Sequence, residues 1–184
     1  MKNLDLALTL LPYFDLLIKR KTNYIVFTKI TNILKNMIIY HKEKPSLKIL
    51  YEVTPEINFM QTCETLLEKI LNPTEPEINC QIVGNLFMAY AEFFANKRSP
   101  EMMVSLISKL NKSSLPVTNQ GIVVYLSFLI QSYTPDMLIF LSNLQVQKKN
   151  GLKILMDHWL LHQPKFAGKL SKLHTTRGLI HIYQ

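Results

Sequence analysis

The chain has 184 residues, of which 48% are hydrophobic and 18% are charged, and its mean hydropathy is +0.09. This composition excludes an intrinsically disordered chain, supplies enough apolar side chains for a sizeable core, and has the length of one domain. The formal net charge is +8, which favours a solvated, lysine-rich surface and is compatible with nucleic acid, anionic lipid or an acidic protein as a partner.

The first predicted helices lie in the N-terminal part of the chain. A helix near residues 3–19 should kink at Pro12, because proline removes a backbone donor from a helix. Asp5 and Asp15 interrupt the same apolar stretch and no cleavage site follows it, so we do not expect a signal peptide. A second helix is predicted from four apolar residues at helical spacing, which are Val26, Ile30, Ile33 and Met37.

Three later helices are predicted from one recurring pattern: Thr54-Pro55-Glu56, Ser99-Pro100-Glu101 and Thr134-Pro135-Asp136. A hydroxyl side chain can accept a hydrogen bond from the first turn of a helix, and proline suits the first helical position. The acid that follows lies at the positive end of the helix dipole. We therefore expect the threonine or serine of each triplet to cap a helix.

Each of these starts is followed by an apolar stripe at helical spacing, then by a break and a second stripe. The first stripes are Met60, Cys63, Leu67, Ile70; Met103, Val104, Ile107, Leu110; and Met137, Leu138, Leu141, Leu144. The breaks are NPTEP, NKSSLPVTNQ and VQKKNG. The second stripes are Val83, Phe87, Tyr90, Phe94; a fully apolar helix near residues 121–132; and Leu152, Leu155, Trp159.

The uncharged segment 113–135 contains an apolar run that is too short to span a membrane, so we expect a buried helix in a soluble protein. The helix starts are separated by about 45 and about 35 residues, which is the range of HEAT and armadillo helix pairs. The predicted fold class is therefore all-α, a HEAT-like solenoid of antiparallel helix pairs that forms a single segment over residues 1–184. A compact bundle would fit the same spacing, but the recurring unit favours a solenoid, which presents a long surface to other macromolecules.

The spacing of His158 and His162 raises the question of a zinc site, because residues four apart share one face of a helix. A zinc protease would carry a glutamate directly after the first histidine, where this chain has Trp159. A third ligand could come from His174 or His181, but no Asp or Glu follows position 157 to supply a base. Since the proline at position 164 should end the helix, we expect His162 in its last turn and Trp159 in the core.

Other catalytic patterns are also missing from the sequence. It contains no glycine-rich phosphate loop and no nucleophile elbow around a serine. Cys63 and Cys80 form no Cys-x-x-Cys pair and have no histidine close in sequence, so we expect reduced, buried thiols inside a cell. We therefore predict no enzymatic activity, no catalytic residue, no metal and no cofactor.

The stretch around Trp159 carries a family resemblance. Trp159, Gln163, Phe166 and Gly168 form the motif W-x-x-x-Q-x-x-F-x-G, which GLKILMDH and DMLIFLSNL precede. Over about residues 115–184 the chain resembles the C-terminal HEAT repeats of the importin-beta superfamily, closest to importins of the importin-nine type. There, a helix that ends in Trp-x-x-x-Gln is followed by a Phe-x-Gly turn and another helix. The resemblance implies that Trp159 is buried between these helices and that Gly168 permits a turn that a side chain would obstruct.

The resemblance also implies a function, as the C-terminal segment of a nuclear transport receptor that shuttles between cytoplasm and nucleus. The intact receptor would bind the GTPase Ran and import basic cargo such as histones or ribosomal proteins. It would have many more repeats, so we expect a fragment, a truncated gene model or a divergent short relative that lacks the N-terminal Ran-binding region. Ser171 replaces an acidic residue of the family, and the net charge of +8 disfavours direct binding of basic cargo by this segment.

A second hypothesis is a basic helical-repeat scaffold that binds nucleic acid or an acidic protein partner. Its basis is the run Lys19-Arg20-Lys21 and a C-terminal set of basic residues without any acid, which comprises Lys165, Lys169, Lys172 and Arg177. Aromatic residues between the basic ones would support nucleic-acid binding, but Tyr13, Tyr24 and Tyr40 mostly fall within apolar stripes. The sequence therefore favours the first hypothesis.

Overall fold

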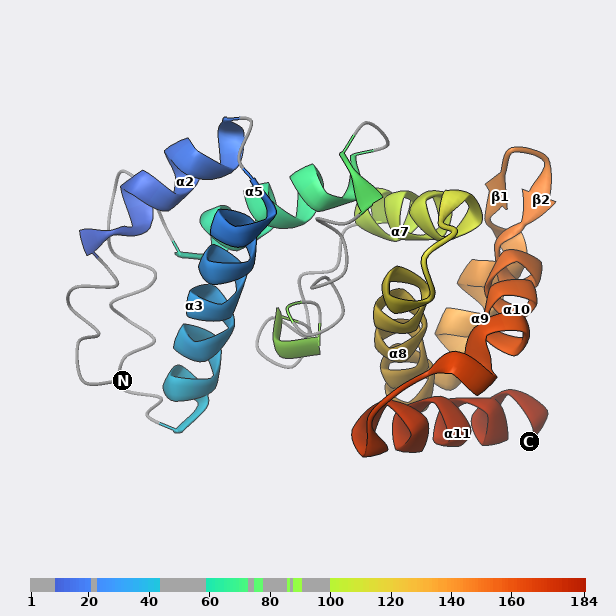
Figure 1. The fold of residues 1–184 in the computed structure, drawn as a ribbon. Helices are drawn as coiled ribbons and strands as arrows, with labels where there is room; N and C mark the ends of the chain where they lie inside the picture. Colours follow the sequence, from blue (N-terminus) through green and yellow to red (C-terminus); the bar gives the residue numbers. More distant parts are fainter. Residues whose placement is uncertain are drawn as a thin grey trace. The chain divides into compact units, whose positions relative to one another are not determined.

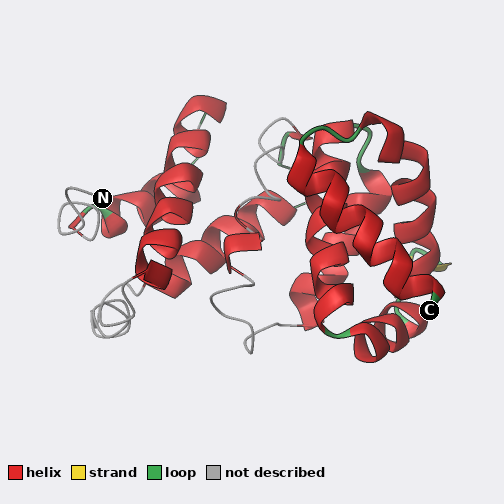
Figure 2. Cartoon of the chain, turned by 90° about the horizontal axis from the view of Figure 1, so that it is seen from below, coloured by secondary structure: helices red, strands yellow, loops and turns green. Residues whose placement is uncertain are grey.

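The structure is a computed structural model that describes residues 9–20, 23–43, 59–72, 75–77, 86, 88–90 and 100–184. Most of these residues are helical (Figures 1 and 2), which confirms the predicted all-α class. The chain divides into two compact units, Met1–Lys97 and Arg98–Gln184, which are described in turn. The single continuous segment over residues 1–184 stays a prediction.

The first unit contains α2 (Leu11–Lys19), α3 (Tyr24–Glu43) and α5 (Phe59–Leu71). The helix α2 packs against α5, and the Lys69 ammonium of α5 donates hydrogen bonds to the Ile18 and Arg20 carbonyls at the end of α2. A cation at this position satisfies carbonyls that have no partner within their own helix and meets the negative end of the helix dipole. Lys69 thus fixes the end of α2 on α5.

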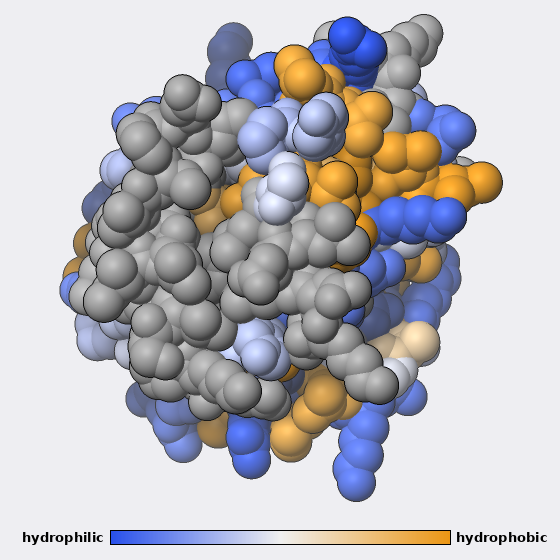
Figure 3. Space-filling model, turned by 90° about the vertical axis from the view of Figure 1, so that its left-hand side faces the viewer, coloured by the Kyte–Doolittle hydropathy of each residue, from blue (hydrophilic) through white to orange (hydrophobic). Residues whose placement is uncertain are grey.

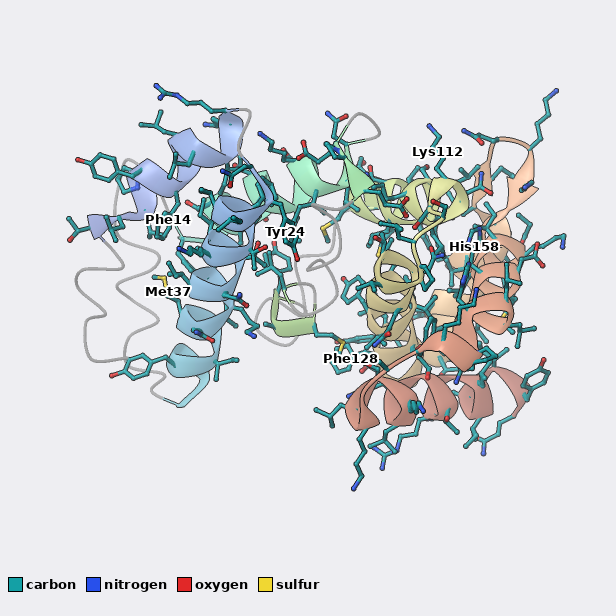
Figure 4. The ribbon with its side chains drawn as sticks, in the orientation of Figure 1. Phe14, Tyr24, Met37, Lys112, Phe128 and His158 are labelled. Atoms are coloured by element: carbon teal, nitrogen blue, oxygen red, sulfur yellow. The ribbon has the colours of Figure 1, made fainter. Side chains whose placement is uncertain are left out.

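Pro12 does not kink a described helix, because it lies in the first turn of α2. There the missing N–H group has no intrahelical partner to lose, so proline is compatible with a regular helix. Leu11, Phe14 and Ile18 of α2 lie at helical spacing and are buried; Phe14 is labelled in Figure 4. Residues 3–8 of the predicted N-terminal helix lie outside the described residues.

The buried face of α3 differs from the predicted stripe at two of its four positions. Ile30 and Met37 are buried as expected, but Phe27 and Leu34 are buried in place of their neighbours Val26 and Ile33, which are only partly covered. Both sets of residues fall on a helical face, so the packing partner decides which face is used.

Apolar side chains also remain on the surface of the first unit. Figure 3 views the molecule from the left of Figure 1 and shows apolar residues gathered at the upper right of that face. The exposed apolar residues of α2 and α3 are Tyr13, Leu16, Leu17, Ile25 and Ile39.

The second unit is a set of packed helices with one short hairpin. Its first helices are α7 (Pro100–Lys112), α8 (Pro116–Ser132) and α9 (Thr134–Asn143). After these come β1 (Gln145–Val146), β2 (Lys149–Asn150), α10 (Gly151–His162), the 3-10 helix η3 (Gln163–Lys165) and α11 (Lys169–Tyr183). From α7 to α10 each helix packs against the next in the chain, and α10 and α11 both pack against α8.

The helix α8 is buried on nearly all sides, as the sequence predicts for its apolar segment. Its buried residues are Thr118, Asn119, Ile122, Val123, Val124, Tyr125, Leu126, Ser127, Leu129 and Ile130. A helix without a polar face must be covered by neighbours, and here α7, α9, α10 and α11 cover it. The helix begins at Pro116, so the residues PVTNQ belong to it and not to the predicted break.

The three predicted helix starts have different outcomes. Thr54-Pro55-Glu56 and the side chain of Ser99 lie outside the described residues, but α7 begins at Pro100 as expected. The cap predicted at Thr134 is wrong. Its hydroxyl does not accept from the first turn of α9 but donates to the Ile130 carbonyl of α8, at 2.7 Å. Only Tyr133 separates α8 from α9, so the free carbonyls at the end of α8 are within reach of this hydroxyl.

The only strands among the described residues are β1 and β2, an antiparallel pair that begins one residue before the predicted break VQKKNG. Gln147 and Lys148 between them have φ values of 51° and 65°. Two central residues at positive φ form the two-residue turn that matches the twist of a hairpin, where asparagine and glycine are preferred. The Asn150 side chain then accepts a hydrogen bond from the Lys153 N–H at 3.0 Å and caps α10.

Two further expectations concern cysteine and the membrane. Cys63 is buried and free, as predicted. Burial is the main cause that raises the pKa of its thiol, and the negative charge of Glu64 raises this pKa further. Cys80 lies outside the described residues. Within the described part of the chain, no helix combines the length and the apolar character needed to cross a bilayer.

Candidate functional site

The residues of the W-x-x-x-Q-x-x-F-x-G motif meet at the junction between α10 and α11. Trp159 lies in the last turns of α10 and is fully buried, which confirms its predicted place in the core. Gln163 opens η3, Phe166 follows it and is buried, and Gly168 stands directly before α11. Since α10 ends at His162, the predicted end of this helix before the proline is also confirmed.

A chain of hydrogen bonds joins the motif to α11. The Trp159 Nε1–H group donates to Gln163 Oε1 at 2.8 Å, and Gln163 Nε2 donates to the Thr175 hydroxyl at 3.2 Å. The Thr175 hydroxyl in turn donates to the Ser171 carbonyl at 2.9 Å. A buried indole N–H needs an acceptor, and Gln163 provides it while its amide group also binds the next helix. The Trp-x-x-x-Gln spacing therefore connects two helices through one side chain.

Gly168 has a φ of 87° and a ψ of 136°, a conformation that residues other than glycine rarely adopt. A Cβ atom built at this position would meet nothing closer than Ser171 Oγ at 3.9 Å. The positive φ, and not a lack of space, therefore disfavours a side chain here, which agrees with the predicted turn.

Gly178 is a packing residue of the same junction that the sequence did not indicate. A Cβ atom here would lie 2.8 Å from Trp159 Cη2 and 2.9 Å from Ser127 Cβ. The indole thus approaches the backbone of α11 at a position that only glycine leaves open. A single glycine within a predicted helix was the available signal, because such a residue often has a packing reason.

Two glutamines of α8 hold the other side of α11. Gln120 binds both backbone groups of Ala167: its Nε2 donates to the carbonyl at 2.7 Å and its Oε1 accepts from the N–H group at 3.0 Å. Near the C-terminal end of α8, Gln131 Nε2 donates to the His174 carbonyl at 3.0 Å. Phe128, labelled in Figure 4, contacts the His174 ring edge-on at 6.3 Å between centroids. Polar side chains thus fix α11 at its start and in its middle.

His158 and His162 share one face of α10, as their spacing predicts, and their rings stack with centroids 6.0 Å apart. Figure 4 labels His158. Burial lowers the pKa of both imidazoles, and a nearby positive charge adds to this, from His162 beside His158 and from Lys165 beside His162. Neither Nδ1 atom has a hydrogen-bond partner within the described part of the chain. Burial and the nearby positive charges thus favour the neutral form of both rings.

A metal site does not form around this pair in the residues that the structure describes. Over these residues, no group of three or more His, Cys, Asp and Glu side chains lies close enough to hold an ion. His174, the possible third ligand, contacts Phe128 instead.

The surface of the second unit includes the outer side of α11, the helix at the lower edge of this unit in Figure 1. Its exposed residues include Lys169, Lys172 and Arg177 together with Leu170 and Leu173. Comparisons with protein-family models, with curated proteins and with solved structures gave no significant match to this chain.

Proposed function

We propose that this chain is the C-terminal segment of a nuclear transport receptor of the importin-beta superfamily, closest to the importin-nine type. The observation that supports the proposal is the junction of α10 and α11. The resemblance implies a tryptophan between two helices, a glutamine at the end of the first and a glycine turn before the second. Trp159, Gln163 and Gly168 have these positions, and the Trp159–Gln163 hydrogen bond explains why the two residues occur together.

The same proposal includes a HEAT-like solenoid of helix pairs. In the second unit, consecutive helices from α7 to α10 pack on one another and α11 packs on α8, an arrangement that a repeat array and a compact bundle share. By resemblance, the intact receptor has further repeats, shuttles between cytoplasm and nucleus, and imports basic cargo. Ran-GTP and cargo would each favour a different state of one flexible superhelix, so that each weakens the binding of the other. No residue carries out covalent chemistry.

A titration of the purified chain with Ran-GTP and with core histones tests this proposal. We expect no saturable binding of Ran-GTP, because the N-terminal repeats that recognise it in the resembled family have no counterpart in this sequence. Core histones should bind weakly at most at physiological salt, since both partners are basic. A submicromolar affinity of this chain alone for Ran-GTP would contradict the proposal.

The second candidate is a scaffold that binds nucleic acid through its basic surface. The exposed Lys169, Lys172 and Arg177 of α11 favour it, as does the absence of acidic residues from Lys165 to Gln184. Binding through phosphate contacts weakens steeply with added salt. An electrophoretic shift of duplex DNA or of single-stranded RNA that is strong at low salt and weakens steeply at moderate salt would favour this function over transport.

A further inference from the structure

The outer side of α11 carries a row of exposed apolar residues. Leu170, Leu173 and Ile180 are 70%, 40% and 50% exposed and lie at positions i, i+3 and i+10, which fall in one row along a helix. The opposite side of α11 faces α8, with Thr175 and Gly178 buried. The row is thus an apolar seam on the side of the helix that α8 does not cover.

Basic residues belong to the same surface. In a helix of 3.6 residues per turn, Arg177 falls in the row itself, in the gap between Leu173 and Ile180, while Lys169 and Lys172 follow along one edge. All three side chains are exposed. The sequence contains no acidic residue after Asp157 that could neutralise them. The seam is therefore apolar with positive charge both within it and beside it.

The charge pattern selects among possible occupants. A second copy related by a two-fold axis would place this basic surface against itself, so repulsion opposes self-association. A helix that enters a lipid surface needs a broad apolar face with its charges on the other side, whereas Arg177 interrupts a narrow row. A helix with leucine-type residues in its own seam and carboxylates beside them would satisfy both features, because a carboxylate can pair with the arginine.

We propose that the outer side of α11 binds an acidic amphipathic helix of a protein partner. The seam of Leu170, Leu173 and Ile180 packs against the apolar side of that helix, and Lys169, Lys172 and Arg177 pair with its carboxylates. This surface depends on α11 alone and is independent of the proposed place of the chain in a transport receptor.

The test uses the full chain and two matched synthetic peptides of about 20 residues, the length of a helix that covers all of α11. Both peptides carry leucine at the a and d positions of a heptad; one has glutamate and the other lysine at the flanking positions. Binding is measured by fluorescence anisotropy. We expect saturable binding of the glutamate peptide only, and a loss of about tenfold or more in affinity for Leu173→Asp, since a charge in the centre of a packed seam removes its main apolar contact. Ile139→Asp, at a 61% exposed position of α9, is the matched control and should bind as the unchanged chain does.

Charge reversal separates recognition from simple loss of structure. The triple variant Lys169→Glu, Lys172→Glu, Arg177→Glu should prefer the lysine peptide, a gain of binding that an unfolded chain would not show. Equal binding of both peptides, an unaltered preference in the triple variant, or equal losses in the Leu173→Asp and Ile139→Asp variants would overturn the proposal. So would binding to vesicles of phosphatidylcholine with about one third phosphatidylserine but to neither peptide, which would assign the surface to a membrane. A dimer that only Leu173→Asp disrupts would assign it to a second copy.

Discussion

The indole of Trp159 provides the most direct residue-scale measurement, because it is the only tryptophan of the chain. It is fully buried and its N–H group donates to Gln163. We therefore expect an emission maximum well to the blue of free tryptophan in water. Trp159→Ala should lower the free energy of unfolding by about 3–5 kcal/mol, the usual loss for a truncated core aromatic residue.

The control for this variant is Leu161→Ala on the same helix, since that leucine is 68% exposed. Its effect should stay within about 0.5 kcal/mol, as for most surface substitutions. Emission at the wavelength of free tryptophan, or equal melting temperatures of the two variants, would show that Trp159 is not a core residue.

Gly168 and Gly178 should both resist substitution, but for different reasons. Gly168→Ala forces a side chain into a backbone conformation at positive φ and should cost about 1–2 kcal/mol. Gly178→Ala places a methyl group 2.8 Å from Trp159 Cη2 and 3.2 Å from the Cα atom of Ser127. Overpacking costs about 1–3 kcal/mol, which outweighs the gain of about 1 kcal/mol that alanine brings to a helix.

Thermal melting checks both glycine variants against Thr176→Ala, an exposed position on α11 that should be neutral or slightly stabilising. The two reasons are separable by emission spectroscopy. Gly178→Ala should also shift the Trp159 spectrum, whereas Gly168→Ala should leave it unchanged. A Gly178→Ala protein that melts like the unchanged chain would mean that the contact with the indole is absent.

The stacked His158 and His162 make stability depend on pH. Burial lowers the pKa of both groups in the folded chain, so the unfolded chain binds more protons below the ordinary histidine pKa of about 6.5. The free energy of unfolding should therefore fall as the pH is lowered from about 7.5 to about 5.5, above the range where carboxylates titrate. A double His158→Gln, His162→Gln variant should have a flatter dependence in urea titrations at these two pH values.

The double variant keeps His174 and His181. Any weaker pH dependence of its free energy of unfolding can therefore be assigned to the loss of His158 and His162. If the unchanged chain and the double variant lose stability equally on acidification, the pair does not titrate in the predicted way.

At the scale of helices, α11 is attached by side-chain amides. Gln120 binds the N–H and carbonyl groups of Ala167, and a leucine in its place would leave both without these partners. Because both hydrogen bonds are exposed and water can replace the lost amide, we expect Gln120→Leu to lower the free energy of unfolding by about 0.5–1.5 kcal/mol, the net contribution of a typical hydrogen bond. Amide hydrogen exchange should then rise in α11 more than in α7.

Gln145→Leu is the matched control, since Gln145 is an exposed residue of β1. It should change neither the melting temperature nor the exchange of α11. If Gln120→Leu raises exchange equally in all helices, this glutamine contributes to general stability and does not attach α11 specifically.

The same elements show what the sequence could predict. Helical spacing identified α5 and α10 because the apolar residues of each helix form one face that can be buried. It identified α8 because that helix has no polar face. In α7 it was wrong at one position of the stripe, since Val104 is exposed and Leu106 is buried in addition to the other predicted residues. Neighbouring faces of a helix are equally apolar until a partner selects one. The hairpin was not predicted because its two turn residues are Gln147 and Lys148. The asparagine and glycine that usually indicate such a turn are absent from these positions.

The candidate site could be predicted in part for a related reason. Trp159 and Gly168 were identifiable from a local motif, and both lie where the motif implies. Gln120, Thr175 and Gly178 were not, because their roles arise from contacts between helices that lie far apart in sequence. A hydroxyl near a helix start also has two possible partners, and at Thr134 the preceding helix supplies the one that is used.

For the whole molecule, we propose that the chain belongs to a transport receptor whose cargo Ran-GTP displaces. An antibody against residues 115–184 should capture the receptor from the cells that produce it, together with histones or ribosomal proteins. Adding Ran-GTP to the immobilised complex should release this cargo and leave Ran bound, whereas Ran-GDP should release nothing, because only one nucleotide state competes. Captured material that contains basic cargo but neither binds Ran-GTP nor loses cargo to it would contradict the account.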